Sequence, residues 1–397
     1  MKIQTSKKII LLLLTSSLLI LTGCKVAFFG RTEMERNEFI RVVGIDKIDE
    51  GVKITIVTED FSSQKGGTNP QKKSNVKTAE GKTVFEAIRN FWSFVDKKPF
   101  FGRVEYLLIG EEAAMDGLLK YIDFFCRDSE IRLNLKVFIV SEANAQEVIA
   151  KTNEENSFIY DKLRGITENQ WGNSTFQKVD LIETMYILDC EYLALYLPCI
   201  HLISPKDGVL NNSQSIMVKG FAIFDGDKLV LDKHEELGRG INWLKSNIQS
   251  GVIVVKSPKG ANVSLEIIDS NTKYEAKIIE DKLIITVKVQ IQSSINEINS
   301  SEDIFTADTI KNLERQQGDI VKNEITKVIK YAQKKKLDFI GAADVVLHKF
   351  PILFEDLYKD QWEEILSDIK FDVIVYPNII KTYDIREPNR SKIGEGK

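Results

Sequence analysis

Stretches with strand periodicity and stretches with helical periodicity are interleaved over the first half of the chain. Val52, Ile54 and Ile56 alternate with polar residues, which predicts a strand. Apolar positions between residues 84 and 95 instead recur at helical spacing. Because both patterns repeat in turn, we predict an α/β or α+β N-terminal domain over residues 38–205.

Within this domain the pattern predicts further elements and one long loop. Residues 65–82 are rich in Gly, Lys, Asn and Thr and are predicted to form an exposed loop. A single helix is expected to carry the apolar face that runs from Met115 to Phe125. Additional helices are predicted near residues 144–151 and 175–190.

Two punctuated segments divide the second half of the chain. Residues 201–212 contain Pro, Gly and two Asn and predict a domain boundary. Asp225-Gly226-Asp227 lies between two apolar runs and predicts a β-hairpin, because Asp-Gly tolerates the positive φ of a tight turn. A second Pro-Gly segment over residues 256–260 closes a predicted middle subdomain, residues 206–258.

The following part, residues 259–385, is predicted to be a C-terminal domain. Strands are expected over residues 265–268 and 273–279, and clean alternation predicts another over 285–291. An amphipathic helix should follow from Ile310 to Ile329.

Shorter helices and a last strand, near residues 371–379, complete the pattern, and the polar residues 386–397 are predicted to form a flexible tail. Strands, then helices, then a strand indicate an antiparallel sheet flanked by a long helix. We therefore predict a multi-domain α+β protein with mixed or antiparallel sheets and packed helices.

Residues 1–23 predict a lipoprotein signal peptide. Three lysines precede a twelve-residue apolar run, Ile9 to Ile20, which is shorter than the roughly 20 residues of a membrane-spanning helix. The run ends in Leu21-Thr22-Gly23-Cys24, which resembles a bacterial lipobox. In that motif Leu21, Thr22 and Gly23 are recognised by the signal peptidase, and the Cys24 thiol receives a diacylglyceryl group. The alternative is an ordinary signal or a core helix that ends in cysteine.

Cleavage before Cys24 would change the charge balance. The whole chain has 54 Lys and Arg against 58 Asp and Glu, and cleavage removes three lysines, which leaves a side-chain balance of −7. This acidity gives no electrostatic reason for a nucleic-acid partner. Two or more acyl chains anchor a protein stably, so a lipidated Cys24 would tether the chain to the outer face of a membrane through residues 24–37.

The sequence contains little material for catalysis or metal binding. Its three histidines, at positions 201, 234 and 348, lie in separate segments without ligand spacing. His234-Glu235-Glu236 resembles the start of a zinc-protease motif, but Gly238 stands where a second histidine is required. We therefore predict no catalytic residues, no metal site and no cofactor.

The cysteines and one basic cluster leave alternatives open. Cys190 and Cys199 could form a disulfide, or these two and Cys126 could remain thiols, which we favour. A run of lysines over residues 327–336 could contact anionic headgroups, but cations near a helix C-terminus are also favoured by the helix dipole. We favour the second interpretation.

Several short segments form an ordered pattern along the chain. They are RVVGID (41–46), GRVEYLLIGEE (102–112), RDSEIRLN (127–134), GFAIFDGDKLVL (220–231), RGINWL (239–244), SGVIVV (250–255) and DFIGAADVVLHKFP (338–351), followed by Trp362. Together with the lipobox, these segments resemble the Ger(x)C family, the C subunits of spore germinant receptors. One departure is that Lys25 and Val26 follow the cysteine, where family members often have Trp and Asp.

The resemblance implies a three-domain, non-enzymatic lipoprotein of a sporulating bacterium. It implies residence at the outer face of the spore inner membrane, in a complex with the integral-membrane subunits A and B, and a role in nutrient-triggered germination. It does not imply that this subunit contacts the nutrient. The motif residues, including Trp243, are interpreted first as folding determinants. The alternative function is a solute-binding lipoprotein of a membrane transporter.

Overall fold

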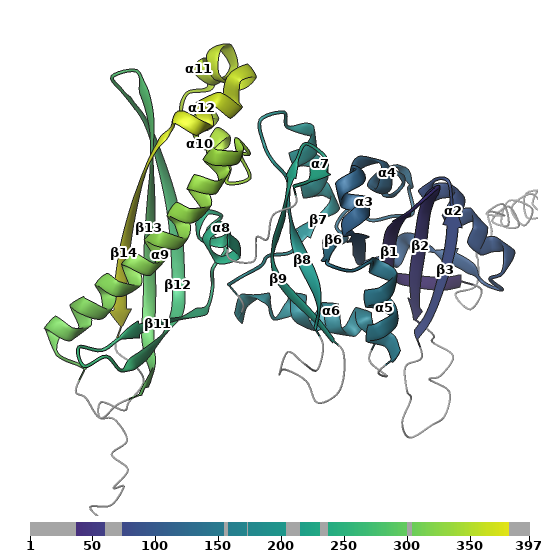
Figure 1. Cartoon of the computed structure of the whole chain (residues 1–397), viewed down its shortest axis with the longest axis horizontal. Helices are drawn as coiled ribbons and strands as arrows, with labels where there is room; N and C mark the ends of the chain where they lie inside the picture. The colour runs from purple at the N-terminus through teal and green to yellow at the C-terminus, as the bar shows by residue number, and fades with distance from the viewer. Residues whose placement is uncertain are drawn as a thin grey trace, which may run out of the picture.

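The computed structural model of the protein describes residues 37–59, 74–154, 158–172, 174–203, 215–230, 237–299 and 304–380 (Figure 1). Two sheets organise these residues, and each sheet lies with its own helices at one end of the molecule (Figure 1). The predicted α+β class, with several domains and helices packed on sheets, is confirmed.

The first sheet is mixed and follows the order β10-β9-β8-β6-β5-β1-β2-β3. Its centre is parallel, because β1, β5, β6 and β8 pair in the same direction, and its two edges are antiparallel. Two short strands, β4 and β7, pair with β1 and β6. The strands are β1 (Asn37–Ile48), β2 (Gly51–Glu59), β3 (Ser74–Gly81), β4 (Lys98–Phe100), β5 (Tyr106–Gly110), β6 (Lys136–Ser141), β7 (Val179–Asp180), β8 (Tyr196–Ile203), β9 (Ser215–Asp225) and β10 (Lys228–Leu229).

Helices cover both faces of this sheet, so its central strands are apolar on both sides. Residues of β5 alternate between two buried clusters: Leu107 and Ile109 pack with α2 and α4, whereas Tyr106 and Leu108 pack with α5 and α6. A parallel sheet buried in this way is expected to read as a continuous apolar run. The helices are α2 (Val84–Asn90), α3 (Glu111–Asp116), α4 (Leu119–Arg127), α5 (Ala145–Glu154), α6 (Ile159–Glu168) and α7 (Leu181–Asp189).

The second sheet has the order β11-β12-β13-β14, and the long helix α9 runs along it (Figure 1). The pairings of β11, β12 and β13 are antiparallel as predicted, whereas β14 joins β13 in parallel, because helices connect these two strands. The elements are α8 (Gly238–Leu244), β11 (Gly251–Lys256), β12 (Asn262–Ile279), β13 (Lys282–Ile298), α9 (Ala307–Lys335), α10 (Ala342–Lys349), α11 (Pro351–Leu353), a π-helical turn (Phe354–Tyr358), α12 (Trp362–Asp368) and β14 (Lys370–Ile380).

Several predicted elements are confirmed. The hairpin at Asp225-Gly226-Asp227 joins β9 to β10, with Gly226 at φ +55°. The alternation over residues 285–291 lies within β13, and the amphipathic stretch from Ile310 to Ile329 lies within α9. The two strands predicted over residues 265–279 are one strand, β12, whose register shifts between Ile267 and Asp269.

Other predictions are wrong, each for a local reason. Residues 74–81, predicted as part of a loop, form the edge strand β3, in which Ala79 is buried but most side chains are exposed, so no apolar alternation marks it. The helix predicted over residues 115–125 is two helices, because Gly117 at φ +118° separates α3 from α4. The helix predicted from residue 175 begins only at Leu181, where the Asp180 side chain accepts the Glu183 N–H.

The residues predicted as a middle subdomain, 206–258, contribute to both sheets. β9 and β10 lie at the edge of the first sheet, and β11 lies at the edge of the second. Residues 1–23, 24–36 and 386–397 lie outside the described part of the chain. The signal peptide, the tether and the tail therefore stay predictions.

The short helix α8 connects the two sheets by unusually close packing. A Cβ atom on Gly238 would lie 2.2 Å from the Thr175 carbonyl oxygen, next to the first sheet. A Cβ atom on Gly240 would lie 2.5 Å from Val328 Cγ2 and 2.7 Å from the Glu324 carbonyl oxygen, both in α9. Only glycine allows the backbone to approach both neighbours so closely.

The packing of α8 predicts the effect of substituting alanine for glycine. Gly240→Ala should lower the free energy of unfolding by about 1–3 kcal/mol, because the added methyl group overlaps α9. The matched control is Gly165→Ala in α6, where a Cβ atom would meet nothing within 4 Å. Helix propensity alone should make that variant more stable by up to about 1 kcal/mol. Equilibrium chemical denaturation measures both, and a stabilised Gly240→Ala protein would contradict the packing argument.

Candidate functional site

The residues predicted for lipid attachment lie outside the described part of the chain. This applies to Cys24 and to Leu21, Thr22 and Gly23, so the lipobox stays a prediction. In the part of the chain that the structure describes, no helix is both long enough and apolar enough to cross a bilayer.

The histidines and cysteines within the described ranges lie apart from one another and contact the backbone or remain thiols. The His201 ring lies 3.1 Å from the Lys219 carbonyl oxygen in the neighbouring strand, and the His348 ring contacts the Asp344 carbonyl oxygen one turn earlier in α10. His234 is outside the described residues. Cys126 and Cys190 are present as thiols. Among the described residues, no group of three or more His, Cys, Asp or Glu side chains is placed to hold a metal ion.

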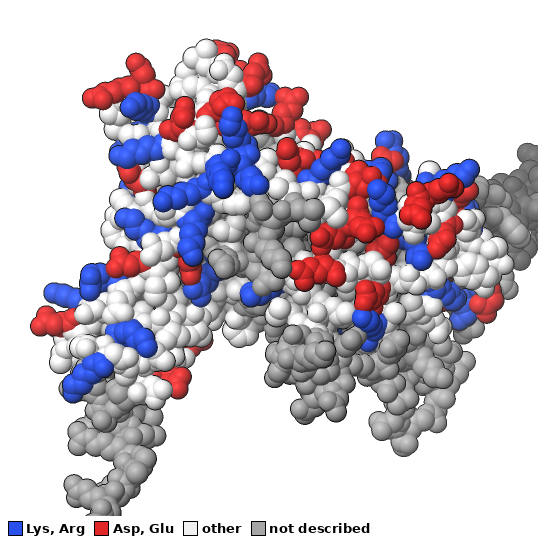
Figure 2. All heavy atoms as spheres, viewed as in Figure 1, with Lys and Arg blue, Asp and Glu red and all other residues white. Residues whose placement is uncertain are grey.

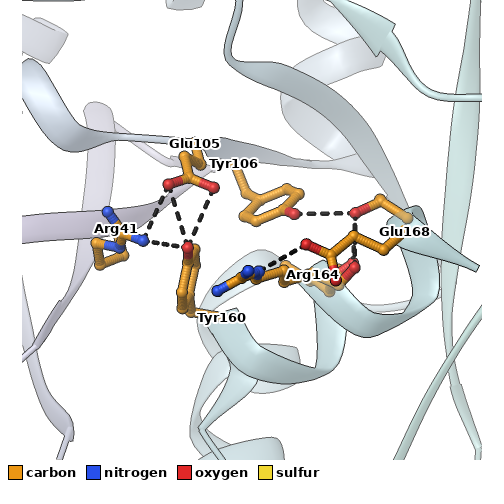
Figure 3. Close-up of polar contacts among 8 residues, drawn as sticks. Arg41, Glu105, Tyr106, Tyr160, Arg164 and Glu168 are labelled. Carbon is orange, nitrogen blue, oxygen red and sulfur yellow. Dashed lines mark hydrogen bonds and ion pairs between the residues drawn. The ribbon is translucent and has the colours of Figure 1, made fainter.

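A polar cluster joins β1, β5 and α6 (Figure 3). The Arg41 guanidinium stacks 4.0 Å above the Tyr160 ring and forms an ion pair of 2.9 Å with Glu105. The Tyr160 hydroxyl accepts a hydrogen bond from Arg41 and donates to the Glu105 carboxylate at 3.1 Å. Glu59 lies 3.7 Å from the same guanidinium, so two carboxylates compensate the charge of a side chain that is only 13% exposed.

The second half of this cluster anchors α6. The hydroxyl groups of Tyr106 and Thr167 are 2.9 Å apart, and Thr167 also donates to the Leu163 carbonyl at 2.8 Å. Arg164 and Glu168 form an ion pair beside them (Figure 3). Burial raises the pKa of the Tyr106 hydroxyl to about 12, so this phenol stays protonated and is not a general base at neutral pH.

A cleft of about 500 Å³ opens beside this cluster, with Arg103, Arg132, Lys136 and Lys178 among its lining residues. Although several cations face it, Arg41 and Arg164 are paired with carboxylates, and Lys136 lies 4.0 Å from Asp180. The described contacts of the cluster thus hold α6 on the sheet.

A second cleft, of about 420 Å³, lies where β1, β5 and β6 end. Parallel sheets commonly bind ligands at this edge. Its central carboxylate is already used, because Asp46 accepts the backbone N–H groups of Ala145 at 2.6 Å and Gln146 at 2.8 Å, at the start of α5. A Cβ atom on Gly110 would lie 2.3 Å from the same carboxylate. The segments at residues 44–46 (Gly-Ile-Asp) and 109–112 (Ile-Gly-Glu-Glu) therefore lie in contact, and Asp46 fixes the start of α5.

A comparable carboxylate is buried at the other end of the chain. Asp338 accepts the backbone N–H groups of Gly341, Ala342 and Ala343 at 2.7–2.9 Å, at the start of α10. It also accepts the indole N–H of Trp362 at 2.9 Å, and both side chains are 3% exposed. Burial raises the pKa of Asp338, whereas these hydrogen bonds oppose the shift.

Lys245 lies between this carboxylate and the first sheet. Its ammonium group is 4.9 Å from the Tyr196 ring centroid in β8. Burial lowers the pKa of Lys245, and the charges of Asp338, Asp344 and Glu183 oppose that change. The backbone of Ala194 donates to the Asp338 carbonyl at 3.1 Å. Residues from both halves of the chain thus meet around one buried cation.

Glu324 in α9 is the partner of α8. Its carboxylate accepts hydrogen bonds from Arg239 Nε and from the Trp243 indole N–H, each at 2.9 Å. Trp243 is fully buried, which confirms its predicted role as a core anchor. Glu324 and Lys245 were not singled out in the sequence, because isolated charged residues in helices normally indicate a solvated surface.

The predicted lysine cluster does lie at the end of α9, which ends at Lys335 with Lys336 in the left-handed conformation at φ +59°. Figure 2 shows Lys and Arg side chains gathered over this part of α9, whereas Asp and Glu side chains gather over the face of the first domain near α3. Lys336 forms an ion pair with Glu364. This placement agrees with cations that stabilise a helix C-terminus.

The fold and these motif residues define a protein of two sheets, each packed with its own helices. Residues 30–202 match the family "Spore germination protein N-terminal domain". Residues 219–383 match the family "Spore germination B3/ GerAC like, C-terminal". The chain belongs to the GerAC-like C family of spore germination proteins.

Relatives cover nearly the whole chain. Spore germination protein KC of Bacillus subtilis is 25% identical, over 92% of this chain and 94% of that protein. Spore germination protein GerQC of Bacillus cereus is 23% identical, over 85% of this chain and 89% of that protein. The crystal structure of the GerBC protein has the same fold, with a TM-score of 0.56 and 18% identity over 85% of this chain and 96% of that one.

The hydrogen bonds to the Asp338 carboxylate predict a large loss of stability when this carboxylate is removed. Asp338→Ala should lower the free energy of unfolding by about 3 kcal/mol, because it leaves buried N–H donors without an acceptor. The control is Asp308→Ala in the first turn of α9, where loss of an exposed acid should cost about 0.5 kcal/mol. Chemical denaturation, followed by the total tryptophan fluorescence, checks both. Equal effects of the two substitutions would show that the hydrogen bonds to Asp338 do not determine folding.

Proposed function

We propose that this protein is the non-enzymatic C subunit of a spore germinant receptor. It is a lipoprotein that is anchored through Cys24 at the outer face of the spore inner membrane, and it is needed for nutrient-triggered germination. The observation that carries this proposal is the order of its parts. A lipobox-like Leu21-Thr22-Gly23-Cys24 precedes two successive spore-germination domains that together span residues 30–383.

The arrangement of the motif residues supports a role as a scaffold and not as an enzyme. Asp46 and Asp338 accept N–H groups at helix starts, and Glu324 holds Arg239 and Trp243. Each of these carboxylates is used for folding. The integral-membrane subunits A and B are the partners that this proposal assigns.

The alternative, a solute-binding lipoprotein of a transporter, fits the architecture less well. Such proteins usually consist of two similar lobes of parallel βαβ units. Here the second sheet is antiparallel except for the β13–β14 pair, and its strands differ in length and connection from those of the first sheet. This difference favours the receptor subunit.

Removal of the lipidated thiol tests the anchor. In Cys24→Ala spores, the fraction of the protein that sediments with membranes should fall by about tenfold or more, because its acyl chains are lost. Germination through this receptor should be lost with it. The control is Cys126→Ala, a partly buried cysteine in α4 that should retain both properties. Mass spectrometry of the wild-type N-terminal peptide should find diacylglyceryl on Cys24. An unmodified cysteine would contradict the proposal.

Co-purification tests the partners. A tagged chain, purified from detergent-solubilised spore inner membrane, should bring down one permease-like and one further multi-spanning protein, identified by mass spectrometry. The Cys24→Ala chain, which should not reach the same membrane site, provides the matched background. Recovery of an ATP-driven transporter in place of these two partners would favour the solute-binding alternative.

A further inference from the structure

Helix α2 and the turn that follows it expose a stripe of large apolar side chains. Phe85 and Trp92 are each 50% exposed, and Phe94, two residues further on, is 55% exposed. Phe85, Arg89 and Trp92 are spaced by four and three residues, so they lie on one side of the helix. The Arg89 guanidinium lies 4.9 Å from the Phe85 ring centroid and 5.8 Å from that of Trp92. We call these four residues, 85, 89, 92 and 94, the aromatic stripe.

Ring contacts and a helix cap hold the aromatic stripe in place. Phe85 stacks on Phe124 of α4 at 5.7 Å, and Phe94 contacts the fully buried Phe91 at 5.7 Å. The start of α2 is fixed by a reciprocal cap, in which Thr83 accepts the Glu86 N–H at 3.2 Å and Glu86 accepts the Lys82 N–H at 2.6 Å. These rings are therefore presented to solvent by a rigid element.

The stripe lies close to the point where the predicted tether enters the domain. Lys98, at the start of β4, is the register partner of Asn37, the first residue of β1. Phe94 precedes Lys98 by four residues, which limits the separation of their Cα atoms to about 14 Å. Figure 1 shows α2 at the end of the molecule that is remote from the second sheet. Twelve residues lie between Cys24 and Asn37, which makes thirteen steps from Cα to Cα, so a fully extended tether reaches about 45 Å.

The chemistry of the stripe fits a lipid surface. Tryptophan and phenylalanine rings partition to the boundary between headgroups and acyl chains, where a long cationic side chain reaches the phosphates. Arg89 contacts the rings of Phe85 and Trp92, and the exposed Lys97 follows Phe94 by three residues. An acyl anchor alone limits the distance of the first domain from the bilayer but does not set the orientation of the domain. An additional apolar contact with the membrane would set it.

We propose that the aromatic stripe rests on the outer leaflet of the membrane and inserts Trp92 at the headgroup–acyl boundary. This proposal rests on the function proposed above, because the lipidated tether brings the stripe to the bilayer. The domain then lies with α2 against the membrane, and the second sheet with α9 points away from it.

Tryptophan fluorescence tests the proposal on the lipidated full-length chain. The protein is reconstituted on vesicles of phosphatidylglycerol and phosphatidylethanolamine whose acyl chains carry bromine, a short-range quencher. Trp92 should be quenched, so Trp92→Phe should remove the quenching. The matched control is Trp171→Phe, because Trp171 is 57% exposed but lies outside the stripe, and this variant should retain the quenching. Trp243 and Trp362 are buried and should contribute none.

The outcomes separate this proposal from the function on which it rests. Flotation with the vesicles, together with loss of quenching only in Trp92→Phe, supports the stripe. Flotation without quenching of Trp92 contradicts the contact between the stripe and the membrane but leaves the lipid anchor intact. An integral-membrane protein would then be the partner to test for the stripe. Failure of the lipidated chain to float overturns both. An unchanged thermal midpoint in Trp92→Phe shows that the variant is folded.

Discussion

The close approach of α8 to both of its neighbours is the constraint on which the relative position of the two sheets depends. The backbone at Gly238 faces the Thr175 carbonyl, and the backbone at Gly240 faces Val328 and Glu324 in α9. The side chain of Asn242 adds a hydrogen bond of 2.8 Å to the Ser174 carbonyl. Because the helix is shared by both halves, any displacement of α8 would move one sheet relative to the other.

Carboxylates that accept several N–H groups fix helices to their neighbours in both domains. Asp46, Glu324 and Asp338 lie far apart in sequence, yet each accepts two or more N–H groups from a neighbouring element. A carboxylate in this setting is favourable only when its lone pairs are satisfied. This requirement explains why short acidic motifs recur at helix starts in a protein for which we propose no catalysis.

The aromatic stripe and the lysine-bearing end of α9 lie on different domains. The first domain carries β1, which directly follows the predicted tether, and the aromatic stripe near it. The lysine-bearing end of α9 belongs to the second domain and lies close to the first, because the carbonyl of Asp338, three residues after the helix ends, accepts the Ala194 N–H. In the membrane orientation that we propose above, the second sheet and α9 would project away from the bilayer (Figure 1).

The sequence alone determined the elements whose signals are local. The alternation in β13, the amphipathic face of α9 and the Asp-Gly turn at residue 226 are each produced by neighbouring residues, so periodicity and turn chemistry were sufficient. The family resemblance was likewise carried by short segments, among them those around Asp46 and Asp338. The tertiary structure decided what these segments do. An edge strand such as β3 pairs through its backbone, so its side chains need not alternate. A partly buried charged residue such as Lys245 or Glu324 reads as a surface residue in the sequence until its distant partners are in place. Partners that are distant in the sequence, such as Asp46 and Ala145, which are 99 residues apart, come together only when the chain folds, because nothing in the local pattern encodes their distance.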